Sequence, residues 1–214
     1  MNPIVFLVDD DAAVRDALRG LLEVEGFAVE AYDSATAFLQ RYRPEQPGCL
    51  ILDVRMPGMS GAELQAELGA RRIRMPIIFL TGHGTIPLSV RAVKAGAVDF
   101  LEKPVNLDTL LARIREAIVV DTRERAVGAV QAQARSKLAR LSAREREIAV
   151  HVLGGRSSKE IARALGISSR TVEVHRGRMM LKLGALSVLE LAAIVQASGL
   201  DLSSPDPGVS ETVS

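Results

Sequence analysis

An apolar run that ends abruptly in a carboxylate constrains the fold of this chain more than any other feature. Residues 49–52 are all apolar, Asp53 follows them, and Pro57 and Gly58 then break the chain. A short apolar run bounded by turn residues is typical of a buried strand in a parallel sheet. Ligands bind at the carboxyl ends of such strands, which makes Asp53 a candidate site residue. Taken alone, Asp53 could equally well cap its own loop.

Four further segments read as strands, and helical patterns alternate with them along the chain. The strands are expected at 4–8, 29–32, 76–80 and 98–101, in addition to the run before Asp53. Apolar spacing or helix caps predict the helices that begin near residues 12, 35, 61, 90 and 107. This alternation predicts an α/β domain over residues 4–118, with a five-stranded, doubly wound parallel sheet.

Polar side chains follow four of these strands. Asp9 and Asp10 follow the first strand, Asp53 the third, Thr81 the fourth and Lys103 the fifth. Right-handed crossovers bring all the carboxyl ends to one edge of the sheet. Three carboxylates at one edge would repel one another, and a hard divalent cation such as Mg²⁺ would relieve that repulsion. One carboxylate could then act as a nucleophile toward a phosphoryl group, with the hydroxyl and the ammonium neutralising its charge.

The front half resembles the receiver domain of two-component response regulators, which has a flavodoxin-like fold. The sequences of residues 53–58 and 79–84 resemble the branch of that family related to FixJ. The resemblance implies that Asp53 is the phosphoacceptor, Asp9 and Asp10 the acidic pair, Thr81 the switch hydroxyl and Lys103 the partner lysine.

Further implications of the same resemblance concern the metal and the switch. It implies that Mg²⁺ binds Asp9, Asp10, Asp53 and the backbone carbonyl of Arg55, and that the bond before Pro104 is cis. It also places Phe100 at the position of the switch aromatic residue. An ordinary packed residue of the strand remains the alternative for Phe100.

Length and charge indicate a second domain of different character. Of the 214 residues, 1–120 carry 13 basic and 16 acidic side chains, whereas 121–200 carry 14 and 7. A basic second half suggests that only this half meets a polyanion. Residues 119–136 lack proline and are rich in Ala, Arg, Glu and Gln, which predicts a helical linker or, equally, a solvated helical spacer. The acidic segment 200–214, rich in Ser and Pro, is expected to be a disordered tail.

Other features narrow the class of protein. The single cysteine, Cys49, lies within an apolar run and is expected to be a reduced, packed thiol. No apolar run of membrane-spanning length and no signal-peptide pattern occurs. A cytoplasmic protein that does not associate with a membrane is therefore expected. Neither a P-loop nor a dinucleotide-binding motif is found. The chain is therefore not expected to be an enzyme, apart from its own phosphoryl uptake and hydrolysis.

Residues 137–199 have the pattern of a small all-α domain. Helices are expected at 143–153, 158–165, 169–183 and 187–197, with capping-box spacing at Ser142, Ser157 and Ser187. Two of these helices, joined by a turn at Gly166, form a predicted helix-turn-helix over about residues 158–177.

The outer face of the second helix of this motif is a candidate DNA-reading surface. Arg, Glu and Val side chains can contact guanine, cytosine and the thymine methyl in the major groove. These base-reading candidates are Arg170, Glu173, Val174 and Arg178. Basic side chains beside them could contact phosphates; they are Lys159, His175, Arg176 and Lys182. The alternative is an amphipathic helix whose outer face is merely solvated.

This half resembles the output domain shared by LuxR and NarL. The resemblance rests on Leu-Ser-x-Arg-Glu at 141–145, Lys-Glu-Ile-Ala at 159–162 and Thr-Val-Glu-Val-His-Arg at 171–176, which adds Thr171 to the DNA-binding candidates. Several relatives carry Lys where this chain has Glu173 and Gly177, so their sequence preference does not carry over. The helix at 187–197 would be the dimer surface in such domains, although a packed core stripe explains its pattern equally simply.

Together the two resemblances predict a DNA-binding transcription regulator that is switched by phosphorylation of Asp53. The expected partners are a sensor histidine kinase, double-stranded promoter DNA, RNA polymerase and, after phosphorylation, a second copy of the chain. Two alternatives stay open. One is a constitutive DNA-binding protein that uses the receiver only to dimerise, and the other is a phosphoryl sink that drains a kinase.

Overall fold

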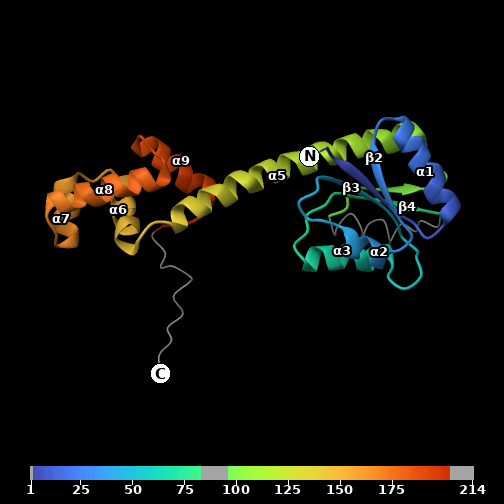
Figure 1. Cartoon of the computed structure of the whole chain (residues 1–214), viewed down its shortest axis with the longest axis horizontal. Helices are drawn as coiled ribbons and strands as arrows, with labels where there is room; N and C mark the ends of the chain where they lie inside the picture. Colours follow the sequence, from blue (N-terminus) through green and yellow to red (C-terminus); the bar gives the residue numbers. More distant parts are fainter. Residues whose placement is uncertain (1, 83–95, 203–214) are drawn as a thin grey trace, which may run out of the picture. The chain divides into compact units, whose positions relative to one another are not determined.

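The computed structural model describes residues 2–82 and 96–202, which form two compact units (Figure 1). Among the described residues, the first unit ends at Arg125 and the second begins at Ala126. Most of the helix expected near residues 90–97 lies outside the described residues.

The first unit is built on a five-stranded parallel sheet, as predicted. Its strand order is β2-β1-β3-β4-β5. Val8 pairs with Leu52, and Thr81 pairs with Glu102, so the carboxyl ends of neighbouring strands are level. The strands are β1 (Ile4–Val8), β2 (Ala28–Tyr32), β3 (Gly48–Asp53), β4 (Ile77–Thr81) and β5 (Asp99–Glu102).

The helices of this unit begin at side-chain caps that are visible in the sequence. Asp11 accepts hydrogen bonds from two backbone amides of the first turn of α1, and Ser34 caps α2. Ser60 and Glu63 form a capping box at the start of α3. The described helices that lie within this unit are α1 (Ala12–Val24), α2 (Ala35–Arg41) and α3 (Gly61–Ala70). Helix α5 (Leu107–Ala139) begins in it and continues beyond residue 125. Helix α5 includes residues 119–136, which are helical as their composition predicted.

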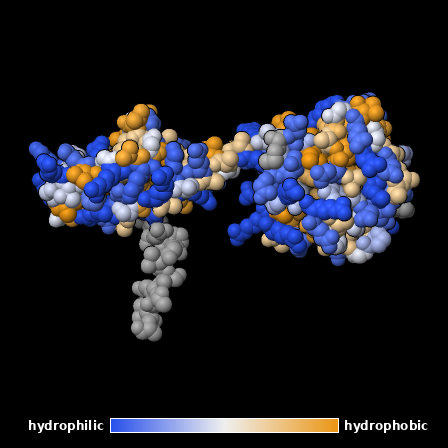
Figure 2. Space-filling model, in the orientation of Figure 1, coloured by the Kyte–Doolittle hydropathy of each residue, from blue (hydrophilic) through white to orange (hydrophobic). Residues whose placement is uncertain are grey.

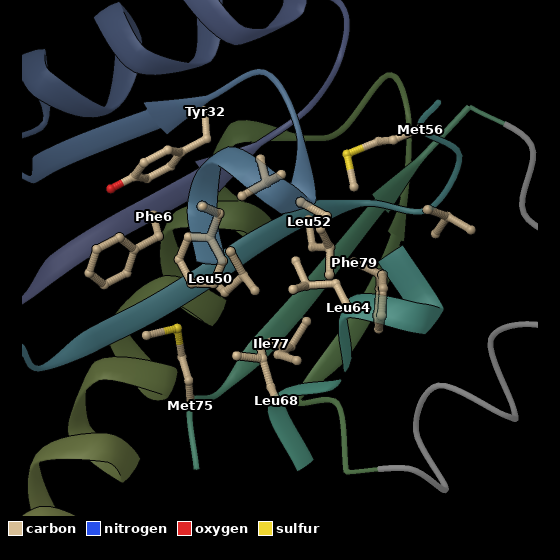
Figure 3. Close-up of a cluster of buried hydrophobic side chains, with 14 of the residues drawn as sticks. Phe6, Tyr32, Leu50, Leu52, Met56, Leu64, Leu68, Met75, Ile77 and Phe79 are labelled. Atoms are coloured by element: carbon tan, nitrogen blue, oxygen red, sulfur yellow. The ribbon is translucent and has the colours of Figure 1, made fainter. Parts of the chain in front are cut away.

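Helices cover both faces of the sheet, and side chains alternate between the two faces along each strand. One face carries Phe6, Leu50 and Phe79 and packs against α2 and α3 (Figure 3). The opposite face carries Val5 and Ile51 and packs against α1 and α5. This double coverage explains why the central strands are almost uninterrupted apolar runs.

Cys49 belongs to the second of these faces. Its thiol is free and fully buried, as expected. Burial raises the pKa of this thiol to about 12, with a smaller contribution from the Asp121 carboxylate.

A buried ion pair joins α5 to the amino end of β3. Asp121 is 1% exposed, and its Oδ2 accepts hydrogen bonds from the backbone N–H of Gly48 at 2.9 Å and from Nε of Arg125 at 2.7 Å. Arg125 also donates to the carbonyl of Pro44 at 2.6 Å. A Cβ at Gly48 would lie 1.8 Å from the carbonyl oxygen of Ile4, so only glycine fits there. Strand β3 and helix α5 are therefore tied together through Asp121.

The second unit is all-helical, as predicted. Leu138, Ile148, Ile161, Val172 and Leu191 contribute to its buried core. Gly166 and Gly184 end two of the helices with φ of 64°, a backbone conformation that glycine adopts without strain. The helices are α6 (Ala143–Leu153), α7 (Ser158–Leu165), α8 (Ser169–Leu183) and α9 (Val188–Ser198).

Within residues 2–82 and 96–202, no single helix is long and apolar enough to cross a membrane. Helices α8 and α9 pass that test of length and composition only as a pair bent by 56°.

Replacing Asp121 with Ala should destabilise the first unit by about 3 kcal/mol, because it leaves Nε of Arg125 and the buried N–H of Gly48 without their acceptor. Urea unfolding followed by tyrosine fluorescence measures this, since both tyrosines of the chain, Tyr32 and Tyr42, belong to the first unit. The control is Glu124→Ala at an exposed position of the same helix. Equal unfolding midpoints for the two variants would contradict a structural role for Asp121.

Candidate functional site

Asp53 is the last residue of β3 and is 7% exposed. Helix α3 begins close to it, because the N–H of Gly61 donates to the carbonyl of Val54 at 3.1 Å. A Cβ at Gly61 would lie 2.3 Å from the carbonyl oxygen of Asp53. Glycine at this position therefore allows the start of α3 to approach the end of β3.

Lys103 joins the two carboxylates that end β1 and β3. Its Nζ lies 2.6 Å from Oδ2 of Asp9 and 2.8 Å from Oδ1 of Asp53. The second oxygen of each carboxylate accepts a backbone N–H, that of Asp11 at 3.0 Å and that of Arg55 at 2.8 Å. The topology thus brings together three residues that are far apart in the sequence. This convergence was expected, because right-handed crossovers bring the carboxyl ends of the strands to one edge.

The ammonium compensates for the burial of two like charges. Asp9 is 2% exposed and Asp53 is 7% exposed, and a shared cation offsets the cost of burying two like charges. Burial by itself would lower the pKa of Lys103, but hydrogen bonds to Asp53 and Asp9 outweigh that effect and raise it. Lys103 therefore stays charged between two acceptors.

The remaining predicted residues of this edge occupy different environments. Thr81 is buried, and its carbonyl accepts the backbone N–H of Lys103 at 2.8 Å. Phe100 is partly buried in β5, with its ring centroid 6.0 Å from that of Phe79. Asp10 and the side chain of Arg55 are exposed. The bond between Lys103 and Pro104 is cis, as the family resemblance implied.

The oxygen donors at this edge of the sheet are compatible with a divalent cation, although too few of the described donors lie together to form a complete set of metal ligands. Asp9 and Asp53 present carboxylate oxygens that already contact a cationic nitrogen, and Mg²⁺ prefers such oxygens. Among the residues that the structure describes, no group of three His, Cys, Asp or Glu side chains is placed to hold a metal ion. Lys103 stands between the two buried carboxylates instead.

Replacing Lys103 with Met should destabilise the first unit by about 3 kcal/mol in metal-free buffer, because two buried carboxylates lose their shared cation. The control is Arg71→Met, which breaks an exposed ion pair with Glu67 and should cost less than about 1 kcal/mol. Urea unfolding with tyrosine fluorescence provides both values. The prediction fails if Lys103→Met changes the unfolding free energy no more than the control does.

The outer face of α8 carries the predicted base-reading residues. Arg170, Glu173, Val174 and Arg178 are all exposed, together with Gly177. Their spacing of three to four residues puts them on one side of the helix, opposite the buried Val172, Met179 and Leu183. The visible surface of this unit is largely hydrophilic (Figure 2).

The predicted phosphate-contacting residues do not share one environment. Lys159 is exposed in the first turn of α7, and His175 and Arg176 are half-buried on α8. Thr171 is half-buried, and its backbone N–H donates to Oγ of Ser168 at 3.1 Å, so it belongs to the cap of α8.

Lys182, also predicted to contact phosphate, forms an ion pair within the unit. Its Nζ lies 2.6 Å from Oε2 of the buried Glu145 in α6. The side chain of Lys182 is 38% exposed, so its ammonium pairs with a buried carboxylate from a partly exposed position.

Helix α9 carries the packed core stripe that its sequence allowed, while its predicted role as a dimer surface stays a prediction. Leu191 is fully buried, with Ile194 and Val195 packed against the core, so part of the helix is a core stripe. Leu186, which precedes the helix, is 92% exposed, and Leu189, in its first turn, is 80% exposed.

Three residues had no role that the sequence revealed: Gly61 and Glu145 near the candidate sites, and Asp121 at the amino end of β3, away from them. The capping-box spacing identified Ser142 but gave no sign that Glu145 is buried. Asp121 reads as an ordinary charged residue of a helix, and Gly61 as the first residue of one. Their roles depend on close approaches between segments that are distant in the chain, for which a single sequence carries no local signal.

Comparison with known proteins agrees with this architecture. Residues 5–115 match the model of the response regulator receiver domain, and residues 139–195 match that of the bacterial regulatory proteins of the luxR family. The transcriptional regulatory protein FixJ of Bradyrhizobium diazoefficiens is 43% identical over 196 residues, 92% of this chain and 96% of FixJ.

Solved structures show the same relationship. The response regulator StyR superposes with a TM-score of 0.86 at 45% identity, covering 92% of this chain and 99% of StyR. Full-length FixJ from B. japonicum superposes with a TM-score of 0.55 at 42% identity, covering 92% and 97%.

Two carboxylates paired with a lysine at the edge of a parallel sheet, followed by a helix-turn-helix unit, are the arrangement of a receiver joined to an output domain. The chain belongs to the two-component response regulators with a LuxR-type DNA-binding domain. It is a phosphorylation-dependent transcriptional regulator. Its relatives are transcriptional regulators rather than enzymes.

Proposed function

We propose that Asp53 accepts the phosphoryl group from a sensor histidine kinase. The supporting observation is the contact of Lys103 with both Asp9 and Asp53 at the carboxyl edge of the sheet. An oxygen of Asp53 attacks phosphorus, the bond from phosphorus to the imidazole nitrogen of the donor breaks, and that nitrogen keeps the electron pair. The Lys103 ammonium and the Thr81 hydroxyl then offset charge on the phosphoryl oxygens.

Mg²⁺ is the proposed cofactor, held by Asp9, Asp10, Asp53 and the backbone carbonyl of Arg55. When bound, it would neutralise part of the charge that gathers during transfer. Phosphoryl uptake and its later hydrolysis are the only chemistry that we assign to the protein.

The output domain would bind double-stranded promoter DNA through α8. Its exposed Arg, Glu and Val side chains match the donor, acceptor and methyl pattern of the major groove. Phosphorylation, read through Thr81 and Phe100, would favour a homodimer on a two-fold DNA site. RNA polymerase is the further proposed partner. The proposed location is the cytoplasm, where promoter DNA would be found.

Replacing Asp53 with Asn should abolish phosphoryl uptake from acetyl phosphate and Mg²⁺ while the protein stays folded, because the amide is a poor nucleophile of nearly the same shape. Intact-protein mass spectrometry measures uptake. Asp108→Asn, at an exposed position of α5, serves as the control and should be phosphorylated normally.

Sedimentation of the same samples tests the output. Dimerisation of the phosphorylated wild type alone supports the switch. Retained uptake in Asp53→Asn would place the acceptor elsewhere. If the phosphorylated protein sediments with the mass of a monomer and still binds DNA, the constitutive alternative is favoured. If it sediments as a monomer and does not bind DNA, the phosphoryl sink is favoured.

Replacing Glu173 with Ala should relax base preference at one position of the site, costing about 1–3 kcal/mol of discrimination, whereas Arg176→Ala should weaken binding to all sequences and lower the salt slope by about one. The probe is a duplex selected from a random pool by the phosphorylated protein, compared with a scrambled duplex. Arg140→Ala, exposed and outside the helix-turn-helix, is the control. Unchanged binding in both test variants would remove α8 from the interface.

A further inference from the structure

The first turn of α6 contacts both helices of the helix-turn-helix. This turn contains Arg144 and Glu145, the last two residues of the Leu-Ser-x-Arg-Glu motif at 141–145. None of the proposed DNA contacts involves this motif. Arg144 reaches the end of α7, and Glu145 reaches the end of α8.

Glu145 has two partners at one oxygen. It is 2% exposed, and its Oε2 accepts the backbone N–H of Ser142 at 2.8 Å and the Nζ of Lys182 at 2.6 Å. The first contact completes the capping box of α6, and the second crosses to the last turn of α8. One carboxylate therefore joins the start of one helix to the end of another.

Two other capping boxes in the chain show that this burial is not needed for capping. Glu63 at the start of α3 and Glu160 at the start of α7 bond to their capping serines in the same way. Both of these carboxylates are exposed. A buried carboxylate is unfavourable unless it is paired, so the burial of Glu145 requires the lysine of α8.

The electrostatics keep this ion pair charged. Burial opposes ionisation of Glu145, but the hydrogen bonds from Lys182 and Ser142 outweigh it and hold the pKa of the carboxyl below its usual value. At neutral pH the contact between α6 and α8 is thus a charge-assisted hydrogen bond.

Arg144 makes the corresponding contact with α7. Its Nη2 donates to the carbonyl of Leu165, the last residue of α7, at 3.0 Å. Its Nη1 lies 2.7 Å from Oε2 of Glu147, which orients the guanidinium. A cation at a helix C-terminus satisfies a carbonyl that has no partner within the helix. Neighbouring residues of α6 therefore hold the ends of α7 and α8.

We propose that Glu145, assisted by Arg144, is a positioning residue that sets the orientation of α8 for sequence-specific DNA binding. This inference rests on the proposed DNA-binding function of α8. It assigns Lys182 to holding α8 in place and not to a phosphate contact. Glu145 touches no DNA in this proposal and acts only through Lys182.

The experiment uses Glu145→Gln in the full-length, phosphorylated protein. Gln preserves the capping box but loses the ion pair with Lys182. Glu160→Gln makes the same change in an exposed capping box and is the matched control. Affinity is measured for the duplex selected by the wild type and for its scrambled version.

Glu145→Gln is expected to bind the selected duplex about tenfold more weakly, the equivalent of one lost base contact, with the scrambled duplex unchanged. The control should bind both duplexes as the wild type does. A merely structural role would alter both affinities in the same proportion, and that result would overturn the proposal.

A phosphate-contacting Lys182 predicts the opposite result. Loss of Glu145 would free the ammonium, so both duplexes would bind equally well or more tightly. Lys182→Met would then lower the salt slope by about one. The positioning role instead predicts an unchanged slope in Lys182→Met, a reduced preference for the selected duplex, and recovery of that preference in Lys182→Arg.

Hydrogen exchange separates failure of this inference from failure of the proposed function. Without DNA, the amides near the end of α8 should exchange faster in Glu145→Gln than in Glu160→Gln. Equal exchange in the two variants would overturn the positioning role of Glu145 even if DNA binds. If the wild type selects no duplex at all, the proposed DNA-binding function fails instead. If Glu145→Gln does not fold, Arg144→Met should give the same loss of preference, and wild-type preference in that variant would overturn the proposal.

Discussion

A single ammonium between two buried carboxylates is the interaction on which the receiver depends. Lys103 is separated from Asp9 by 94 residues and from Asp53 by 50, so the contact exists only if β1, β3 and β5 end at the same level. The apolar strands provide that alignment, since both faces of the sheet are covered by helices. Hydrophobic burial thus holds like charges together at a site that could not form in an unfolded chain.

The same physical device occurs twice more in the described chain, with different consequences. Asp121 with Arg125 ties α5 to β3, and Glu145 with Lys182 ties α6 to α8. In each case a nearly inaccessible carboxylate meets a cation that is itself partly exposed. Because an unpaired buried carboxylate is strongly unfavourable, each pair favours the arrangement in which its two elements lie together.

The sequence was sufficient for most elements and for the convergence of the receiver site. Apolar runs and serine or aspartate caps are local signals, and they located the described strands and helices to within one or two residues. Level strand ends then followed from the topology. The partner of Lys182 could not be predicted in this way. Glu145 lies 37 residues away, and its burial results from the packing of α6 on α8, which a single sequence does not reveal.

The isolation of Cys49 has a practical consequence. It is the only cysteine of the chain, and its fully buried thiol remains protonated in any ordinary buffer. The native protein therefore offers no reactive thiol to maleimides or to oxidants that form disulfides. A cysteine introduced at an exposed position such as Val174 or Leu189 would be the one site at which a fluorophore or spin label attaches, with no need to remove the natural residue.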